Sequence, residues 1–167
     1  WYPGDDYVDI IGVSYFENID LKGAVAIDHF GSDNVLSQRD LLDQMLLIAR
    51  THNKPVMVAE STPKGYDILN LTKTNTNRYW DGAVYSVWDS DPTKRVKAGT
   101  KSVTANEIWN DFYKPLFEYI ESNGDVIKYF HYIDADWTSD LQFQWTTELQ
   151  YWGNAMVQSN EYIKRKW

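Results

Sequence analysis

The chain has 167 residues and carries 16 Lys plus Arg against 24 Asp plus Glu, a formal net charge of −8 at pH 7. The length predicts one domain, and the acidic balance gives no electrostatic reason to bind nucleic acid or an anionic membrane. The absence of cysteine excludes disulfides, thiolate catalysis and Cys-based zinc sites, and no apolar run is long enough to span a membrane. The 8 Trp and 12 Tyr stand out, because their rings combine a flat apolar face with a polar group, which suits the binding of sugars, bases and peptides.

The first part of the chain alternates strand and helix patterns. Residues 8–16 (VDIIGVSYF) form a near-continuous apolar run, which is typical of a strand buried on both faces. Residues 37–53 place apolar side chains at helical spacing, and either Ser37 or Asp40 can cap that helix. Residues 55–61 (PVMVAES) predict a second buried strand.

The second part continues the alternation after a long interruption. Residues 66–103 are polar and aromatic with several turn clusters, and they predict a long loop of a kind that is usually either functional or disordered. Residues 104–122 predict a helix that a capping box beginning at Thr104 would open. Residues 126–133 predict a third strand, and residues 155–166 a last helix.

The order strand, helix, strand, helix, strand, helix predicts an α/β fold with a parallel sheet and covering helices. The pattern alone leaves two architectures open, part of a (β/α)8 barrel or a small flavodoxin-like sheet. Three parallel strands leave two apolar edges without a partner, which is an aggregation liability. We therefore expect the chain to be the end of a larger α/β fold, or to cover these edges by homo-oligomerisation.

Candidate site residues follow the three predicted strands. In a (β/α)8 barrel the site lies at the carboxyl ends of the strands, and those ends hold Tyr15, Glu60, Asp134, Asp136 and Trp137. The arrangement predicts a rim of carboxylates and aromatic rings.

Glu60 is the most informative of these residues because it ends an otherwise apolar strand. By strand alternation it falls on the same face as Val56 and Val58. A carboxylate there costs desolvation unless it is hydrogen-bonded, and its pKa responds to its neighbours. Tyr15 could donate its hydroxyl to this carboxylate. The alternatives are a strand-end acid that faces water and a tyrosine that only fills the barrel mouth.

Five segments carry a resemblance to a known enzyme family: residues 1–15 (WYPGDDYVDIIGVSY), 54–63 (KPVMVAESTP), 127–137 (IKYFHYIDADW), 152–154 (WGN) and 163–167 (IKRKW). In this order they resemble strands six to eight and the last helix region of glycoside hydrolase family 26 and its relatives in clan A, such as β-mannanases. The resemblance implies a partial TIM barrel made of the last three βα units, with residues 1–167 as a single incomplete domain.

The resemblance also implies roles for individual residues. Glu60 matches the nucleophile of the family, Tyr15 the tyrosine that hydrogen-bonds it, and Trp137 an aromatic floor of the sugar subsite. Such enzymes are retaining and need a second carboxyl group about 5–5.5 Å from the first. The family's acid/base glutamate follows strand four, which this chain lacks, and Glu17, Asp134 or Asp136 would have to replace it.

The expected function is therefore that of a C-terminal portion of a retaining glycoside hydrolase, acting on a β-linked polysaccharide such as mannan and inactive or nearly so alone. The alternatives are a non-catalytic carbohydrate-binding fragment and a fragment stabilised only by self-association. The partner is an oligosaccharide or polysaccharide, no cofactor or metal is expected, and the resemblance implies a secreted or periplasmic protein.

Aromatic residues outside the strands extend the predicted sugar site. Trp80, Trp88 and Trp145 lie in predicted loops on the sugar side, where rings can stack on pyranose faces, and Asp136 is expected to bind substrate with them. The alternative is that the three rings only fill gaps under a long loop. Two other residues are expected to have structural rather than binding roles. Trp109 lies on a predicted amphipathic helix and is expected in the core, and His131, inside the third strand, is expected to be a hydrogen-bonded core histidine.

Overall fold

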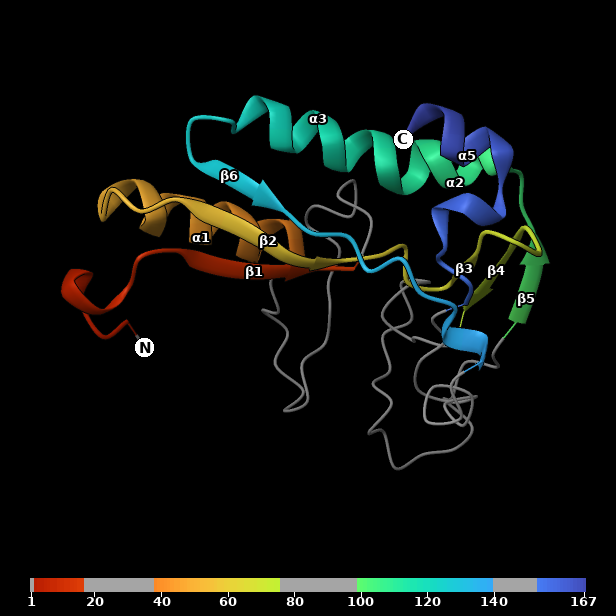
Figure 1. The fold of residues 1–167 in the computed structure, drawn as a ribbon, viewed down its shortest axis with the longest axis horizontal. Coiled ribbons are helices and arrows are strands. Elements are labelled where there is room, and N and C mark those ends of the chain that lie inside the picture. Colours follow the sequence, from red (N-terminus) through yellow and green to blue (C-terminus); the bar gives the residue numbers. More distant parts are fainter. Residues whose placement is uncertain (1, 17–37, 76–98, 140–152) are drawn as a thin grey trace.

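The computed structural model describes residues 2–16, 38–75, 99–139 and 153–167. Its centre is a parallel sheet of three strands, β1 (Ile11–Tyr15), β2 (Val56–Ser61) and β6 (Ile127–Phe130), in the spatial order β1-β2-β6. Figure 1 shows the three strands running in one direction, as the sequence predicted. A short 3-10 turn, η1 (Asp5–Tyr7), precedes β1. The α/β class with a parallel sheet is confirmed.

Helices cover one face of this sheet. The helix α1 (Gln38–Thr51) follows β1, and a second helical rod consists of α2 (Ala105–Ile108), a π-helical turn η4 (Trp109–Tyr113) and α3 (Lys114–Ser122). The rod runs antiparallel to the strands (Figure 1). The π turn ends two residues before Pro115, which has no N–H to offer to the ordinary helical ladder.

The core lies between the sheet and these helices. Val56 and Val58 of β2 are fully buried, with Leu46 of α1 and Phe112 and Leu116 of the rod among their neighbours in one apolar cluster. Trp109, predicted to be a core residue, is 8% exposed and belongs to the same cluster.

Both strand ladders contain an irregularity. Between β1 and β2 the pairing passes from Val13↔Val58 to Ser14↔Glu60, so that one residue of β2 is skipped. Between β2 and β6 the pairing passes from Val56↔Ile127 to Met57↔Tyr129. Each inserted residue reverses the face on which the following side chains of that strand lie.

A second, antiparallel sheet arises where the sequence predicted only a long loop. It contains β3 (Tyr66–Asp67), β4 (Thr72–Asn75) and β5 (Gly99–Ser102) and lies beyond the carboxyl ends of the parallel strands (Figure 1). The Tyr66 hydroxyl joins it to the helical rod by donating to Asp111 (2.6 Å), while Lys73 Nζ donates to the same hydroxyl (2.7 Å). Burial raises the pKa of Tyr66 above its ordinary value, so the hydroxyl remains a donor.

The last helix is shorter than predicted. A 3-10 turn, η6 (Val157–Ser159), precedes α5 (Glu161–Lys166), and Asn160 separates them. The Asn160 side chain accepts hydrogen bonds from the backbone N–H groups of Tyr162 and Ile163. This cap starts the helix at Glu161 rather than near residue 155. Within the described ranges, no helix is long and apolar enough to cross a membrane.

The predicted capping box at the start of α2 is present. The Thr104 hydroxyl accepts from the Glu107 N–H (3.1 Å), and the Glu107 carboxylate accepts from the Thr104 N–H (2.6 Å). We expect Thr104→Ala to lower the free energy of unfolding by about 1 kcal/mol, measured by urea titration. Thr51→Ala is the control, because the Thr51 hydroxyl donates to Leu47 O within an exposed helix end, and it should change stability by under about 0.5 kcal/mol. Equal losses in both variants would contradict the capping role.

Candidate active site

Glu60 lies near the carboxyl end of the central strand β2, on the face of the sheet that no described helix covers. Its side chain is exposed, and its Oε2 accepts a hydrogen bond from the Ser14 hydroxyl at 2.8 Å. Ser14 is the residue of β1 that pairs with Glu60 in the sheet ladder. Two adjacent strands therefore fix the carboxylate, one by carrying it and the other by donating to it.

The prediction of the sheet face on which Glu60 lies is wrong. Strand alternation placed it with Val56 and Val58, which are buried against the helices, whereas the structure exposes Glu60 and buries Ser61. The reason is the register shift, which skips one residue of β2 just before Glu60 and turns it to the opposite face. The desolvation expected for a buried carboxylate therefore does not apply to this residue.

Tyr15 lies on the other face of the sheet. It pairs with Ser61, is 1% exposed, and its ring stacks on that of Phe112 with a centroid distance of 6.2 Å. The structure therefore brings Ser14, and not Tyr15, to the Glu60 carboxylate. Sequence reasoning missed Ser14, although the signal was available: it is the polar residue next to Tyr15, and adjacent strand residues face opposite ways.

The third strand adds polar and aromatic groups to the same open face. Tyr129 is 49% exposed and pairs with Met57. His131 follows β6 and is exposed, so the prediction of a core histidine is wrong. The shift at Lys128 explains this, because it turns Tyr129 and, two residues later, His131 away from the helices.

The carboxylates after β6 hold the loop in place. Asp134 accepts from the Val157 N–H (2.7 Å), and Asp136 accepts from the N–H (3.0 Å) and hydroxyl (2.6 Å) of Thr138. Asp136 also forms an antiparallel bridge with Asn154. Asp134 therefore ties this loop to the segment before α5, and Asp136 stabilises its own loop, which gives each a structural role beside the predicted one.

Trp137 is partly buried and begins a 3-10 turn, η5 (Trp137–Ser139). Its backbone N–H donates to Gly153 O at 3.2 Å, which ties this segment to the chain before α5. The predicted sugar-binding residues Trp80, Trp88 and Trp145, and the candidate acid Glu17, lie outside the described residues.

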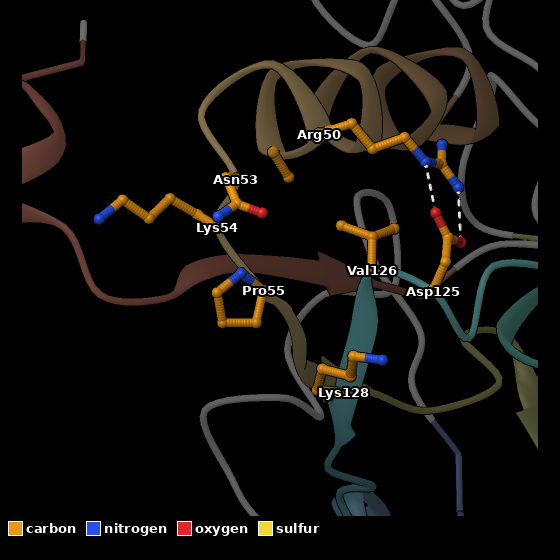
Figure 2. A pocket seen from close by; sticks show the side chains of 8 residues that line it. Arg50, Asn53, Lys54, Pro55, Asp125, Val126 and Lys128 are labelled. Carbon is orange, nitrogen blue, oxygen red and sulfur yellow. Dashed lines mark hydrogen bonds and ion pairs between the residues drawn. The ribbon is translucent and has the colours of Figure 1, made fainter.

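A cavity of about 320 Å³ lies at the opposite, amino end of the strands (Figure 2). Arg50 and Asp125 close one side with a two-pronged ion pair of 2.8 and 2.9 Å, and this hydrogen bonding lowers the pKa of Asp125. Lys128, on another side, donates to Gly124 O. Three charged lining residues, Arg50, Asp125 and Lys128, are thus occupied in holding the turn before β6, and we place the candidate site at the Glu60 end.

No protein-family model matches the chain. Two curated proteins do match it: the β-1,3-xylanase TXYA of Vibrio sp. and a β-1,3-xylanase of Alcaligenes sp., each 33% identical over 169 aligned residues. The chain is similar to both over its whole length. It spans 29% of the length of each relative.

Proposed function

We propose that this chain is part of a retaining glycoside hydrolase that cleaves a β-linked polysaccharide, with Glu60 as the nucleophile. The observation that carries the proposal is the placement of Glu60, an exposed carboxylate near the carboxyl end of the central strand, held by the Ser14 hydroxyl at 2.8 Å. The similarity to two β-1,3-xylanases supports the same class of chemistry. Carboxyl ends of parallel strands are also where the active sites of (β/α)8 barrels lie.

The proposed reaction begins with attack of a Glu60 oxygen on the anomeric carbon. A bond forms between this oxygen and the carbon, and the glycosidic carbon–oxygen bond breaks, with its electron pair leaving on the departing sugar oxygen. Ser14 donates to Oε2, so we assign the attack to Oε1. The hydrogen bond limits rotation of the carboxylate, and the exposed position of Glu60 leaves Oε1 accessible to a substrate.

A retaining mechanism also needs an acid that protonates the leaving oxygen, about 5–5.5 Å from the nucleophile. Of the candidates within the described residues, Asp134 accepts from the Val157 N–H of η6 and Asp136 from the Thr138 N–H, so both carboxylates already hold backbone groups. We therefore assign the acid to residues outside the described part or to a longer protein. The relatives, of which this chain spans 29%, are long enough to hold further βα units.

The proposed architecture is a partial (β/α)8 barrel, with residues 1–167 contributing three consecutive βα units to a single incomplete domain. Three parallel strands in sequence order, helices on one face and an open opposite face support it. The open face would be the inward face of the barrel. A secreted protein fits a polysaccharide substrate, and that location is part of the proposal.

We take β-1,3-xylan as the first substrate to test and mannan as the second. The names of the relatives support xylan, whereas the segment resemblance pointed to mannan. Trp137, close in sequence to β6, is the described residue that we assign to stacking on a sugar ring.

The test uses a reagent that needs no acid catalyst. A 2,4-dinitrophenyl 2-deoxy-2-fluoro-β-xyloside has a leaving group that departs unprotonated, so a nucleophile alone can form the glycosyl ester. We expect intact-mass spectrometry to detect one added sugar, and peptide mapping to place it on Glu60. The matched mannoside should label more slowly if xylan is the substrate. No adduct, or an adduct on another residue, would contradict the assignment of Glu60.

A further inference from the structure

The irregularity in the β1–β2 ladder is a bulge in β2, and it gives Glu60 a defined neighbour on β1. Val13 pairs with Val58 and Tyr15 pairs with Ser61, so β2 has two residues where β1 has only Ser14. The second of these two residues is Glu60, which pairs with Ser14 and accepts its hydroxyl hydrogen bond. The bulge therefore presents the carboxylate to whichever residue stands level with it on each side.

On the other side of the bulge, β6 also runs past with a single residue. Phe130 pairs with Val58, and the next residue, His131, donates its N–H to Val58 O at 2.8 Å. The bond from the Ile133 N–H to Ser61 O, 2.9 Å long, repeats this pattern two residues further on. The residue between them is thus level with Ser61, and His131 lies opposite the bulge.

The His131 side chain shares a sheet face with the candidate nucleophile. Its two neighbours in the chain point toward the helices. The Phe130 ring contacts Phe117 of α3, with 5.8 Å between the ring centroids. The Tyr132 ring contacts Tyr113 of η4 at 5.9 Å. Because adjacent strand residues face opposite ways, His131 points to the open face, where it is exposed.

Ser14, Glu60 and His131 thus form a row of polar side chains across three adjacent strands. Ser14 donates to Oε2 from one flank, and His131 stands on the other flank, one strand spacing of about 4.8 Å away along the sheet. Within the described part of the chain, the imidazole makes no hydrogen bond or ion pair. Both of its nitrogens are therefore open to a ligand beside the carboxylate.

We propose that His131 is a substrate-binding residue whose imidazole binds a hydroxyl group of the sugar ring that Glu60 attacks, an inference that rests on the proposed function. A neutral imidazole offers one donor and one acceptor, as a sugar hydroxyl does, so the two groups can pair in either direction. A strand spacing is comparable to the width of a pyranose ring. A sugar with its anomeric carbon at Glu60 therefore brings its hydroxyl groups within reach of His131.

A sugar hydroxyl suits the imidazole better than the carboxylate does. Ser14 already restrains Oε2, and a second hydrogen bond donated to Oε1 would weaken the oxygen that we assign to the attack. A buried hydrogen bond to a substrate hydroxyl is also a strong means of discrimination, because an analogue without that hydroxyl leaves the protein group without a partner. His131 would thus select among sugars by their hydroxyl pattern.

Nuclear magnetic resonance of the 167-residue chain with isotope-labelled histidines tests the binding, with β-1,3-xylobiose as the first probe and β-1,4-mannobiose as the second. We expect one of the two sugars to shift the imidazole resonances of His131 saturably; comparison with His131→Gln assigns them. His52 is the internal control, because it lies in the turn before β2, at the amino end of the strands, with its Nδ1 2.8 Å from Asp5 Oδ1. No shift at His131, or an equal shift at His52, would overturn the proposal.

Substitutions separate sugar binding from an effect on Glu60. His131→Ala should weaken sugar affinity, measured from backbone amide shifts, about tenfold, because one hydrogen bond to the sugar is lost. The labelling rate at saturating fluoroxyloside should change less than about threefold. His131→Gln keeps a donor and an acceptor and should restore the affinity to within about threefold. An unchanged affinity in His131→Ala, with or without slower labelling, would overturn the proposal.

Deoxy analogues of the bound disaccharide, each without one hydroxyl group, identify the hydroxyl that His131 binds. One analogue should bind the unsubstituted chain about tenfold more weakly and lose no further affinity in His131→Ala. Fully additive losses for every analogue would contradict the pairing. Failure here is distinct from failure of the proposed function: an ester on Glu60 without His131 shifts would overturn only the histidine's role, whereas His131 shifts without an ester would contradict only the nucleophile.

Discussion

Replacement of Glu60 by Gln is expected to slow covalent labelling by the fluoroxyloside at least about 10³-fold, because an amide oxygen is a far weaker nucleophile than a carboxylate. The variant should fold normally, since Glu60 is exposed and the Ser14 hydroxyl that donates to it can donate equally to an amide oxygen. Glu121→Gln, at an exposed position of α3, is the matched control and should label at the normal rate. Undiminished labelling of the Glu60 variant would refute its role.

Ser14→Ala separates positioning from attack at the same site. Loss of the 2.8 Å hydrogen bond frees the carboxylate to rotate, and we expect labelling to slow about tenfold. The affinity for the reagent should hardly change, because Ser14 acts through Glu60. Ser122→Ala is the control, since the Ser122 hydroxyl donates to Glu118 O on an exposed helix end, away from Glu60. A loss of affinity with an unchanged labelling rate would contradict the positioning role.

Gly153→Ala is expected to cause the largest loss of stability among single substitutions proposed for this chain. Gly153 has a φ of +66°, and a Cβ there would lie 2.0 Å from Tyr66 O and 2.6 Å from Tyr66 C. Left-handed backbone and overlap with another backbone segment together should cost about 3–4 kcal/mol. The midpoint of thermal unfolding should fall by about 10 °C.

Gly12→Ala is the control for that substitution. A Cβ at Gly12 would meet only Ala59 Cβ at an ordinary 3.9 Å, and its φ lies outside the left-handed region, so stability should change by under about 0.5 kcal/mol. Because Gly153 O accepts from the backbone N–H of Trp137, the Gly153 variant should also alter the fluorescence of Trp137. A Gly153→Ala chain as stable as the control would contradict the close backbone approach.

Local patterns in the sequence predicted most of the parallel sheet and its helices. The apolar runs identified the three strands, and the TANE segment identified the start of the second helix through Thr104 and Glu107. These features depend on neighbours in the chain, which is why sequence periodicity finds them. The short antiparallel sheet escaped prediction because its strands, such as β4 (Thr72–Asn75), are polar and paired across a long segment.

The faces of the site residues escaped prediction for a different reason. A strand pattern fixes alternation only while the ladder is regular, and each of the two ladders shifts register once. A shift before Glu60 turns it to the open face, and a shift at Lys128 does the same for His131. Such bulges depend on how neighbouring strands pair, and no local residue pattern marks them.

The sequence by itself therefore determined the α/β class, the order of the strands and the presence of a carboxylate near the end of the central one, because apolar periodicity and capping act over a few residues. Only the tertiary structure decided which face Glu60 occupies and that Ser14, rather than Tyr15, holds it. Those outcomes depend on the register between strands that lie more than 40 residues apart in the chain, as the separation of 46 between Ser14 and Glu60 shows.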